Sequence, residues 1–382
     1  MELPETTAAA PLSVDALLEL AVEMGASDLH LTVGVQPVVR RRGHIEPLRE
    51  FPELDADLMR QLIYRITTTD QQKHLELGRQ LDFAYGIRGL ARFRVNAYYQ
   101  RESLAAAFRT IPTEIRSLEE LGLPSSLHEL TSKPRGLVLV TGPTGSGKST
   151  TLAAIIDEIN RNRSEHILTI EDPIEFLHHH GTCIVNQREI GQDAPTFALG
   201  LKAALRQDPD VILVGEMRDM ETIATALTAA ETGHLVFGTL HTRGAAGTID
   251  RIIDVFPAEQ QEQVRVQLAA TLEGVVTQML LPTANGSGRV AALEVLFPDD
   301  AVRNLIRQGK AEQIYSIMQT NRSRGMQTLE QSLADLTMRR VVTKEVALGA
   351  TSRPEQFEGL LERVGFESET TPVLRVAGGS LQ

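Results

Sequence analysis

The sequence has few aromatic residues and only one cysteine. Phe and Tyr make up 4% of its 382 residues, and Trp is absent. This composition offers little material for the aromatic platforms on which nucleic-acid bases stack. The single cysteine, Cys183, excludes an intrachain disulfide and a four-cysteine zinc site, and it fits a reducing compartment.

Positive charge and long apolar runs are also scarce. The 38 Lys and Arg residues stand against 50 Asp and Glu residues, which gives a net charge of −12 and disfavours a nucleic-acid partner. No basic segment followed by an apolar run occurs near the N-terminus, and no window reaches 18 uninterrupted apolar residues. These absences predict a soluble, cytoplasmic protein. The hydrophobic content of 42% is enough to bury a real core, and the length of 382 residues suggests two or three domains.

A glycine-rich stretch between a predicted strand and a predicted helix is the most informative segment. It fits G-x-x-x-x-G-K-[ST], follows the apolar run 136–141 and precedes apolar residues at helical spacing in 150–160. Backbone N–H groups at such a junction can wrap a phosphate, with Lys148 on the β- and γ-phosphates and the Ser149 hydroxyl on Mg²⁺. The predicted nucleotide site comprises Gly142, Pro143, Thr144, Gly145, Ser146, Gly147, Lys148, Ser149 and Thr150.

Two acidic segments follow predicted strands, and hydrolysis of a nucleotide needs such carboxylates. In 208–218 an apolar strand leads to Glu216, the pattern of a Walker B segment, so Glu216 is predicted at the carboxyl end of a parallel strand. In 169–175, Glu171, Asp172 and Glu175 lie within five residues and would repel one another unless a cation or solvent lay among them. From these residues alone, a solvated acidic loop is an equally good interpretation.

Strand and helix patterns divide the chain into two parts. Helices mixed with strands that look antiparallel predict a small α+β domain over 13–110, with Ser13 as a helix N-cap and a capping box at Thr69 and Gln72. A linker over 111–117 leads to an α/β domain over 118–365, in which strands and helices alternate as in a parallel sheet. An antiparallel hairpin is expected over 277–295, and the termini 1–12 and 366–382 are expected to be flexible and disordered, respectively.

Four segments together resemble the secretion ATPase superfamily, the hexameric motors of type IV pili and type II secretion. They are 142–150, 167–175, 205–218 and 232–241, and the resemblance spans roughly 13–365. It is closest to the pilus-retraction ATPases, because 26–31 and the segment Ala301-Val-Arg-Asn-Leu-Ile-Arg307 resemble motifs at their two ends. The latter differs from the retraction motif by Val302 in place of isoleucine, which keeps shape and hydrophobicity.

The resemblance implies a RecA-like P-loop ATPase domain preceded by a small α+β, PAS-like domain. It implies that Glu175 is the catalytic base, that Glu216 is the Walker B carboxylate near Mg²⁺, and that His234 and His241 sense or contact the γ-phosphate. A lone histidine on a strand more often packs in the core, and His241 is the better candidate because it ends its strand. Most surface arginines are merely solvated, but a ring hydrolase often receives a cationic finger from its neighbour, and the family pattern singles out Arg94 and Arg109.

Several functional alternatives remain open from the sequence. The main one is a homohexameric, ATP-driven retraction motor that works with an inner-membrane platform protein and lies peripherally at the pilus base. A paralogue that shares its work is a further candidate partner. Others are an accessory or regulatory ATPase of the same machine, a pilus or secretion assembly ATPase, and a nucleic-acid translocase. The translocase is disfavoured by charge, and the extension motors generally carry a four-cysteine zinc module that Cys183 alone cannot build. His178–His180 with Cys183 could suggest a metal, although a solvated loop is the more ordinary interpretation.

Overall fold

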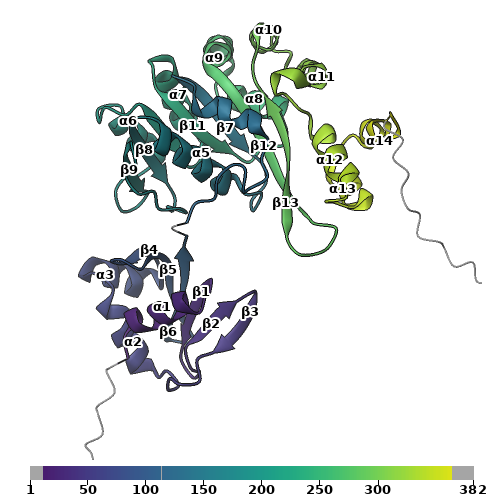
Figure 1. Cartoon of the computed structure of the whole chain (residues 1–382). Coiled ribbons are helices and arrows are strands. Elements are labelled where there is room, and N and C mark those ends of the chain that lie inside the picture. The colour runs from purple at the N-terminus through teal and green to yellow at the C-terminus, as the bar shows by residue number, and fades with distance from the viewer. Residues whose placement is uncertain (1–11, 113, 364–382) are drawn as a thin grey trace, which may run out of the picture. The chain divides into compact units, whose positions relative to one another are not determined.

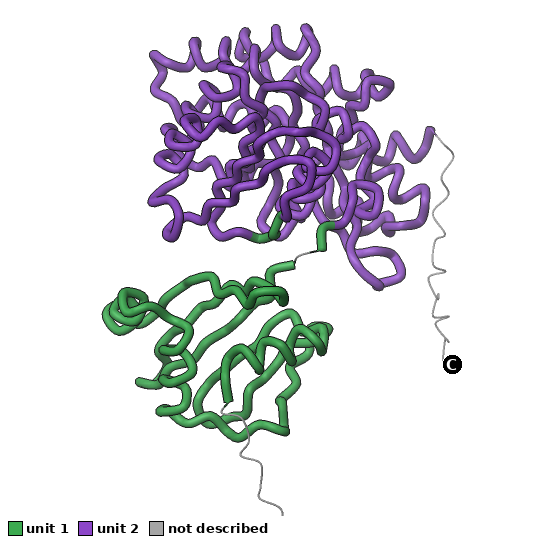
Figure 2. The backbone as a smooth tube through the Cα atoms, turned by 60° about the vertical axis from the view of Figure 1, so that its left-hand side comes forward, with its two compact units in different colours: residues 1–115, 175–178 green, residues 116–174, 179–382 purple. Residues whose placement is uncertain are grey.

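The chain folds into two compact units, shown in different colours in Figure 2. The computed structural model describes residues 12–112 and 114–363. One unit comprises residues 1–115 with 175–178, and the other comprises 116–174 with 179–382. The predicted flexible N-terminus, except residue 12, and the predicted disordered tail 366–382 lie outside the described residues.

The N-terminal unit is an antiparallel sheet with three helices. Its strand order is β3-β2-β1-β6-β5-β4, and every neighbouring pair is antiparallel. Alternation along β5 buries Phe93, Val95 and Ala97, which pack in one core with Leu17 and Leu18. The elements are α1 (Val14–Glu23), β1 (Asp28–Thr32), β2 (Val38–Arg41), β3 (His44–Pro47), α2 (Ala56–Arg65), α3 (Thr69–Gly78), β4 (Gln80–Ile87), β5 (Ala91–Gln100) and β6 (Ser103–Ile111).

Of the two predicted helix caps, one is confirmed and the other is displaced by one residue. Ser13 caps α1 as expected, since its Oγ accepts from the Ala16 amide at 3.2 Å. The capping box of α3 was predicted at Thr69 and Gln72, which is wrong by one residue: it is formed by Thr68 and Gln71. Thr68 has the extended backbone of an N-cap, whereas Thr69 is already the first helical residue.

The C-terminal unit is built on a seven-stranded sheet with the order β13-β12-β7-β11-β10-β8-β9 (Figure 1). All neighbouring pairs are parallel except β12 with β13. The central strands β7, β10 and β11 are buried along their whole length, and each buried Val or Leu contributes about 1.5–3 kcal/mol. The strands are β7 (Gly136–Thr141), β8 (His166–Glu171), β9 (Ile184–Glu189), β10 (Val211–Val214), β11 (Leu235–Leu240), β12 (Leu272–Pro282) and β13 (Arg289–Leu296).

Helices connect and flank these strands. The apolar face of α5 buries Leu152, Ile155 and Ile159, and α7 adds Ile223 and Leu227 to the same core. The helices up to the hairpin are α4 (His128–Thr131), α5 (Lys148–Asn162), α6 (Phe197–Ala204), α7 (Met220–Glu231), α8 (Ala245–Asp254) and α9 (Ala258–Thr271).

The β12–β13 hairpin begins earlier than the sequence indicates. Apolar residues in 264–276 recur at helical spacing, but α9 ends at Thr271 and β12 starts at Leu272. Leu268 before this break and Val275 after it are both fully buried, although Val266 is exposed, so the apolar pattern does not reveal where the helical period ends. The parallel pairing of β12 with β7 decides the strand.

Of the C-terminal helices, α12 and α13 pack beside this hairpin, whereas α10 packs on α9 and α11 on α8 (Figure 1). Leu333 of α12 and Phe357 of α14 form a small core with Leu281 and Ala292 from the two hairpin strands. These helices are α10 (Asp300–Gln308), α11 (Ile314–Thr320), α12 (Leu329–Met338), α13 (Lys344–Ala350) and α14 (Pro354–Arg363). Over residues 12–112 and 114–363, no helix has both the length and the apolar character needed to cross a membrane.

Candidate functional site

The predicted phosphate loop lies between β7 and α5. Gly142, Gly145 and Gly147 all have positive φ, in the region that favours glycine. A Cβ on Gly142 would lie 2.1 Å from the carbonyl oxygen of Gln278, so only glycine fits there. Gly147 is the N-cap of α5 and makes no side-chain cap bond, which leaves the positive end of a 15-residue helix at the loop.

The lysine of the loop lies over this same backbone turn. Lys148 Nζ donates to the carbonyl oxygens of Gly142 at 2.9 Å and Pro143 at 3.2 Å. An ammonium at this position can form charge-assisted hydrogen bonds with a phosphate bound at the loop. Ser149 and Thr150 follow in the first turn of α5, and both are half-buried. This arrangement suits a phosphate chain.

Glu216 and His241 meet at the carboxyl end of the sheet. Glu216 follows β10, His241 follows β11, and His241 Nε2 lies 3.0 Å from Glu216 Oε1. Arg218 Nε hydrogen-bonds the same oxygen, and this bond raises the pKa of Arg218. The Met217 amide donates to the Thr239 carbonyl at 3.0 Å, which ties the segment to β11. The structure therefore brings together two of the predicted residues and adds Arg218.

The second acidic segment begins where β8 ends. Glu171 Oε1 accepts from Thr169 Oγ1 at 2.6 Å and from Gln187 Nε2 at 3.2 Å, so this carboxylate is held along the sheet. The Ile174 amide donates to the buried carboxylate of Glu189 at 3.2 Å. Glu175 is exposed and belongs to the segment 175–178 that groups with the N-terminal unit. The repulsion expected in this segment is relieved because Glu171 is hydrogen-bonded and Glu175 is solvated.

His234 does not lie with these residues. It precedes β11, whereas His241 follows it, and a six-residue strand separates its two ends by about 20 Å. His234 Nδ1 is 3.0 Å from the Ala229 carbonyl oxygen, and the His234 carbonyl accepts from the Gly136 amide at 3.0 Å. Within its own chain, His234 therefore joins α7 to the amino ends of β7 and β11. Its proximity to His241 in the sequence is misleading because an extended strand lies between them.

The two predicted arginines lie side by side on the N-terminal sheet. Arg94 on β5 pairs directly with Arg109 on β6, which pairs with Asp28 on β1. Arg109 Nε donates to Asp28 Oδ1 at 2.9 Å, and Asp28 is buried. Arg94 is exposed. Arg109 therefore neutralises a buried carboxylate, while Arg94 presents its charge to solvent.

Sequence reasoning missed the polar residues of β12 that touch the phosphate loop. Gln278, only 4% exposed, donates from Nε2 to the Ser146 carbonyl at 2.8 Å and accepts from Thr151 Oγ1 at 2.7 Å. Thr277 Oγ1 lies 2.8 Å from Thr141 Oγ1. The one available signal was two consecutive polar residues in the middle of an apolar predicted strand.

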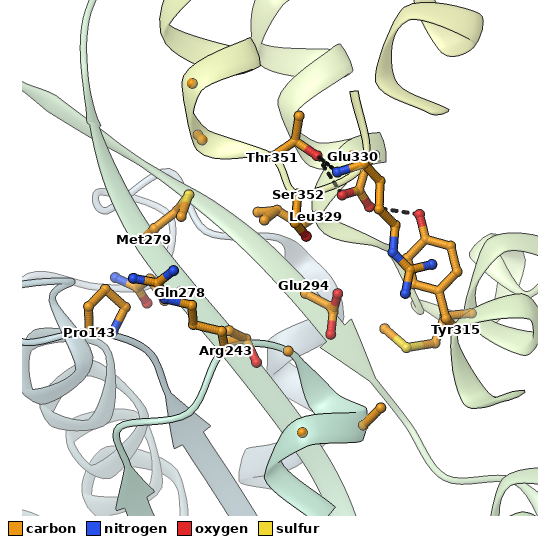
Figure 3. A pocket seen from close by; sticks show the side chains of 18 residues that line it. Pro143, Arg243, Gln278, Met279, Glu294, Tyr315, Leu329, Glu330, Thr351 and Ser352 are labelled. Carbon is orange, nitrogen blue, oxygen red and sulfur yellow. Dashed lines mark hydrogen bonds between the residues drawn. The ribbon is translucent and has the colours of Figure 1, made fainter. Parts of the chain in front are cut away.

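A cavity of about 480 Å³ adjoins the loop at Pro143 and runs between the hairpin and the C-terminal helices (Figure 3). On the far wall Glu330 accepts from Tyr315 Oη and Thr351 Oγ1, both at 2.7 Å. Burial and the hydrogen bond to Glu330 raise the pKa of Tyr315 to about 12. Burial also raises the pKa of Glu294, which accepts from the Ala245 amide at 2.6 Å. Both carboxylates, Glu330 and Glu294, are thus hydrogen-bonded.

Ser149 and Glu216 are the residues that could hold Mg²⁺ beside a bound nucleotide. In the described part of the chain, no group of three or more His, Cys, Asp or Glu side chains could hold a metal ion, the segment His178–His180 with Cys183 included. Mg²⁺ commonly takes one or two protein oxygens and completes its shell with phosphates and water. The hydroxyl of Ser149 and the carboxylate of Glu216 are oxygens of this kind.

Comparison with known proteins identifies the family. The model of the family described as "Type II/IV secretion system protein" matches residues 5–348. The chain belongs to this family. Within it, the sequence is 50% identical over 346 residues to the type IV pilus retraction ATPase PilT of Pseudomonas aeruginosa, covering 91% of this chain and all of that protein. It is 41% identical over 358 residues to the type IV pilus ATPase PilU of the same organism, covering 94% and 93% of the two chains.

Solved structures of secretion ATPases share the α/β fold. A crystal structure of the pilus retraction motor PilT with bound ADP has a TM-score of 0.85 and 51% identity, and the match covers 91% of this chain and 99% of that one. The ATPase DotB of Legionella pneumophila has a TM-score of 0.76 and 32% identity, covering 88% and 94%. Membership in the type II/IV secretion system family and the phosphate loop agree that this is an ATPase.

Proposed function

We propose that this chain is the ATP-hydrolysing motor of type IV pilus retraction, the process that drives twitching motility. The observation that carries the proposal is that the phosphate loop, Glu216 and His241 follow the carboxyl ends of the adjacent parallel strands β7, β10 and β11, and that His241 contacts Glu216. Full-length similarity to PilT, a retraction ATPase, supports retraction rather than assembly of the pilus. An accessory ATPase of the same machine is the second candidate. The working form is a homohexamer, cytoplasmic and peripherally associated with an inner-membrane platform protein at the pilus base, with no nucleic acid or zinc.

Each site residue then has a definite role. The loop amides and Lys148 bind the phosphates of ATP, and Ser149 and Glu216 hold Mg²⁺, which neutralises phosphate charge when bound. His241 and Arg218 fix the Glu216 carboxylate through its Oε1. Glu175 accepts a proton from the attacking water. Arg94, with Arg109 beside it, approaches the phosphates of a neighbouring subunit and stabilises the negative charge of the transferred group.

We also propose the finer architecture. The parallel sheet with its phosphate loop supports a RecA-like ATPase domain over 118–365, and the antiparallel sheet with three helices supports a PAS-like domain over 13–110, joined by a linker over 111–117. A paralogue could share the work in the cell, and co-purification would detect it.

The proposal is tested by measuring ATP turnover together with particle mass. We expect Mg²⁺-dependent turnover from a particle of six chains, and cells lacking the gene should keep surface pili but lose twitching. A hexamer that binds ATP without turnover would favour the accessory role. Loss of surface pili in the deletion strain would instead indicate an assembly motor.

A mixing experiment tests the shared site. Rings of Lys148→Ala chains and rings of Arg94→Ala chains should each be nearly inactive, and mixed rings should recover part of the activity because some interfaces combine an intact loop with an intact arginine. Arg94 is preferable to Arg109, since Arg109→Ala would also remove the partner of buried Asp28. Turnover is measured across mixing ratios, with mixed rings verified by native mass spectrometry. Verified mixed rings without any recovery would leave Arg94 with no role in a neighbour's site.

A further inference from the structure

The phosphate loop rests directly on one residue of β12. In the sheet, β12 runs parallel to β7, and Thr277 pairs with Thr141, the last residue before the loop. Gln278, the next residue along β12, is therefore beside the first loop glycine, Gly142. Figure 3 shows Gln278 on the same side of the cavity as Pro143.

Two loop glycines are in contact with Gln278. A Cβ on Gly142 would lie 2.1 Å from the Gln278 carbonyl oxygen, and a Cβ on Gly147 would lie 2.7 Å from Gln278 Nε2. The first contact involves the backbone of β12 and the second its buried side chain. Both ends of the loop therefore pack against Gln278.

The hydrogen bonds of Gln278 also set the orientation of a peptide group. Gln278 Nε2 donates to the Ser146 carbonyl at 2.8 Å. In a trans peptide the C=O of residue 146 and the N–H of residue 147 point in opposite directions. Holding the Ser146 oxygen against β12 therefore aims the Gly147 N–H away from β12, and it keeps a partly negative oxygen away from bound phosphates.

The other end of the Gln278 amide is fixed as well. Gln278 Oε1 accepts from Thr151 Oγ1 at 2.7 Å, and Thr151 is a buried residue of the first turn of α5. Because that bond uses the oxygen, the amide must present its NH₂ to Ser146. Glutamine is suited to this position because it is uncharged and has both a donor and an acceptor.

We propose that Gln278 is a positioning residue for ATP hydrolysis, which orients the Ser146–Gly147 peptide so that the loop can bind phosphate. The inference rests on the proposed ATPase function. Gln278 itself does not reach the reacting atoms in this role. It acts through the peptide group that it holds.

The decisive variant is Gln278→Glu, which keeps the acceptor for Thr151 and replaces the donor to Ser146 by a second oxygen. We expect kcat/KM for ATP to fall by about 10- to 100-fold. A buried hydrogen bond is lost, and the new carboxylate oxygen faces the Ser146 carbonyl oxygen, so that two acceptors oppose each other. Thr151→Val removes only the indirect bond and should lower kcat/KM by less than about tenfold. Gln260→Glu, the same charge change at an exposed site on α9, should leave both turnover and affinity unchanged.

Affinity for a fluorescent ATP analogue is measured beside turnover, at a temperature at which each variant remains folded. The expected result is weaker binding of the analogue by Gln278→Glu, in parallel with the fall in kcat/KM. Wild-type affinity and kcat/KM in folded Gln278→Glu would overturn the inference. A wild-type protein that binds the analogue but never hydrolyses ATP would contradict the proposed function instead, while the affinity comparison would still test Gln278.

Discussion

Glu175→Gln should lower the kcat for ATP hydrolysis by at least about 100-fold while leaving the Kd for ATP nearly unchanged. The amide has almost the same shape as the carboxylate but cannot accept the proton of the attacking water, and loss of general-base catalysis has this magnitude. Because Glu175 is exposed, the substitution should change the free energy of unfolding very little. Steady-state turnover and equilibrium binding of ATP to the same preparation give the two quantities.

Lys148→Ala is the matched comparison, because it should weaken ATP binding itself. Its ammonium donates to the carbonyl oxygens of Gly142 and Pro143 in the phosphate loop. Near wild-type turnover by Glu175→Gln would show that Glu175 is not the base. The alternative would then be Glu216, whose carboxylate already contacts His241.

Leu305→Ala should leave ring formation and ATP turnover in place but abolish pilus retraction in cells. This residue lies on α10, whose sequence resembles the retraction motif, and it is only half-buried beside the core. Arg303 fixes α10, because its guanidinium donates to the Ala269 carbonyl at 2.7 Å and pairs with Glu273 at 2.8 Å. The mutant cells should keep surface pili and lose twitching, which pilus counts and motility assays measure.

Ile306→Ala serves as the packing control for that experiment. Val302 and Ile306 are fully buried, and truncating such a residue costs about 2–5 kcal/mol of folding free energy. This variant should melt well below wild type, whereas Leu305→Ala should melt close to it. Equal losses of thermal stability in the two variants would mean that α10 acts only through packing, and loss of pili from Leu305→Ala cells would indicate a role in assembly.

The order of strands and helices follows from local patterns in the sequence. The phosphate loop, the strand before Glu216 and the strand between His234 and His241 were all recognisable, because a buried parallel strand is a short apolar run and glycines mark its turns. The switch from α9 to β12 at Leu272 was not recognisable, because buried apolar residues lie both before and after it. Arg94 and Arg109 could be named as candidates, but their direct pairing depends on the register of β5 and β6.

By itself, the sequence predicted the nucleotide site and determined the family resemblance, because phosphate binding uses consecutive backbone groups and a contiguous motif specifies them. Only the tertiary structure showed that His234 lies apart from His241 and that Arg109 pairs with the buried Asp28. It also placed Gln278 against the phosphate loop. Those assignments depend on which strands are neighbours and at which register. Gln278 lies 132 residues from its partner Ser146, and no local pattern encodes a contact at that separation.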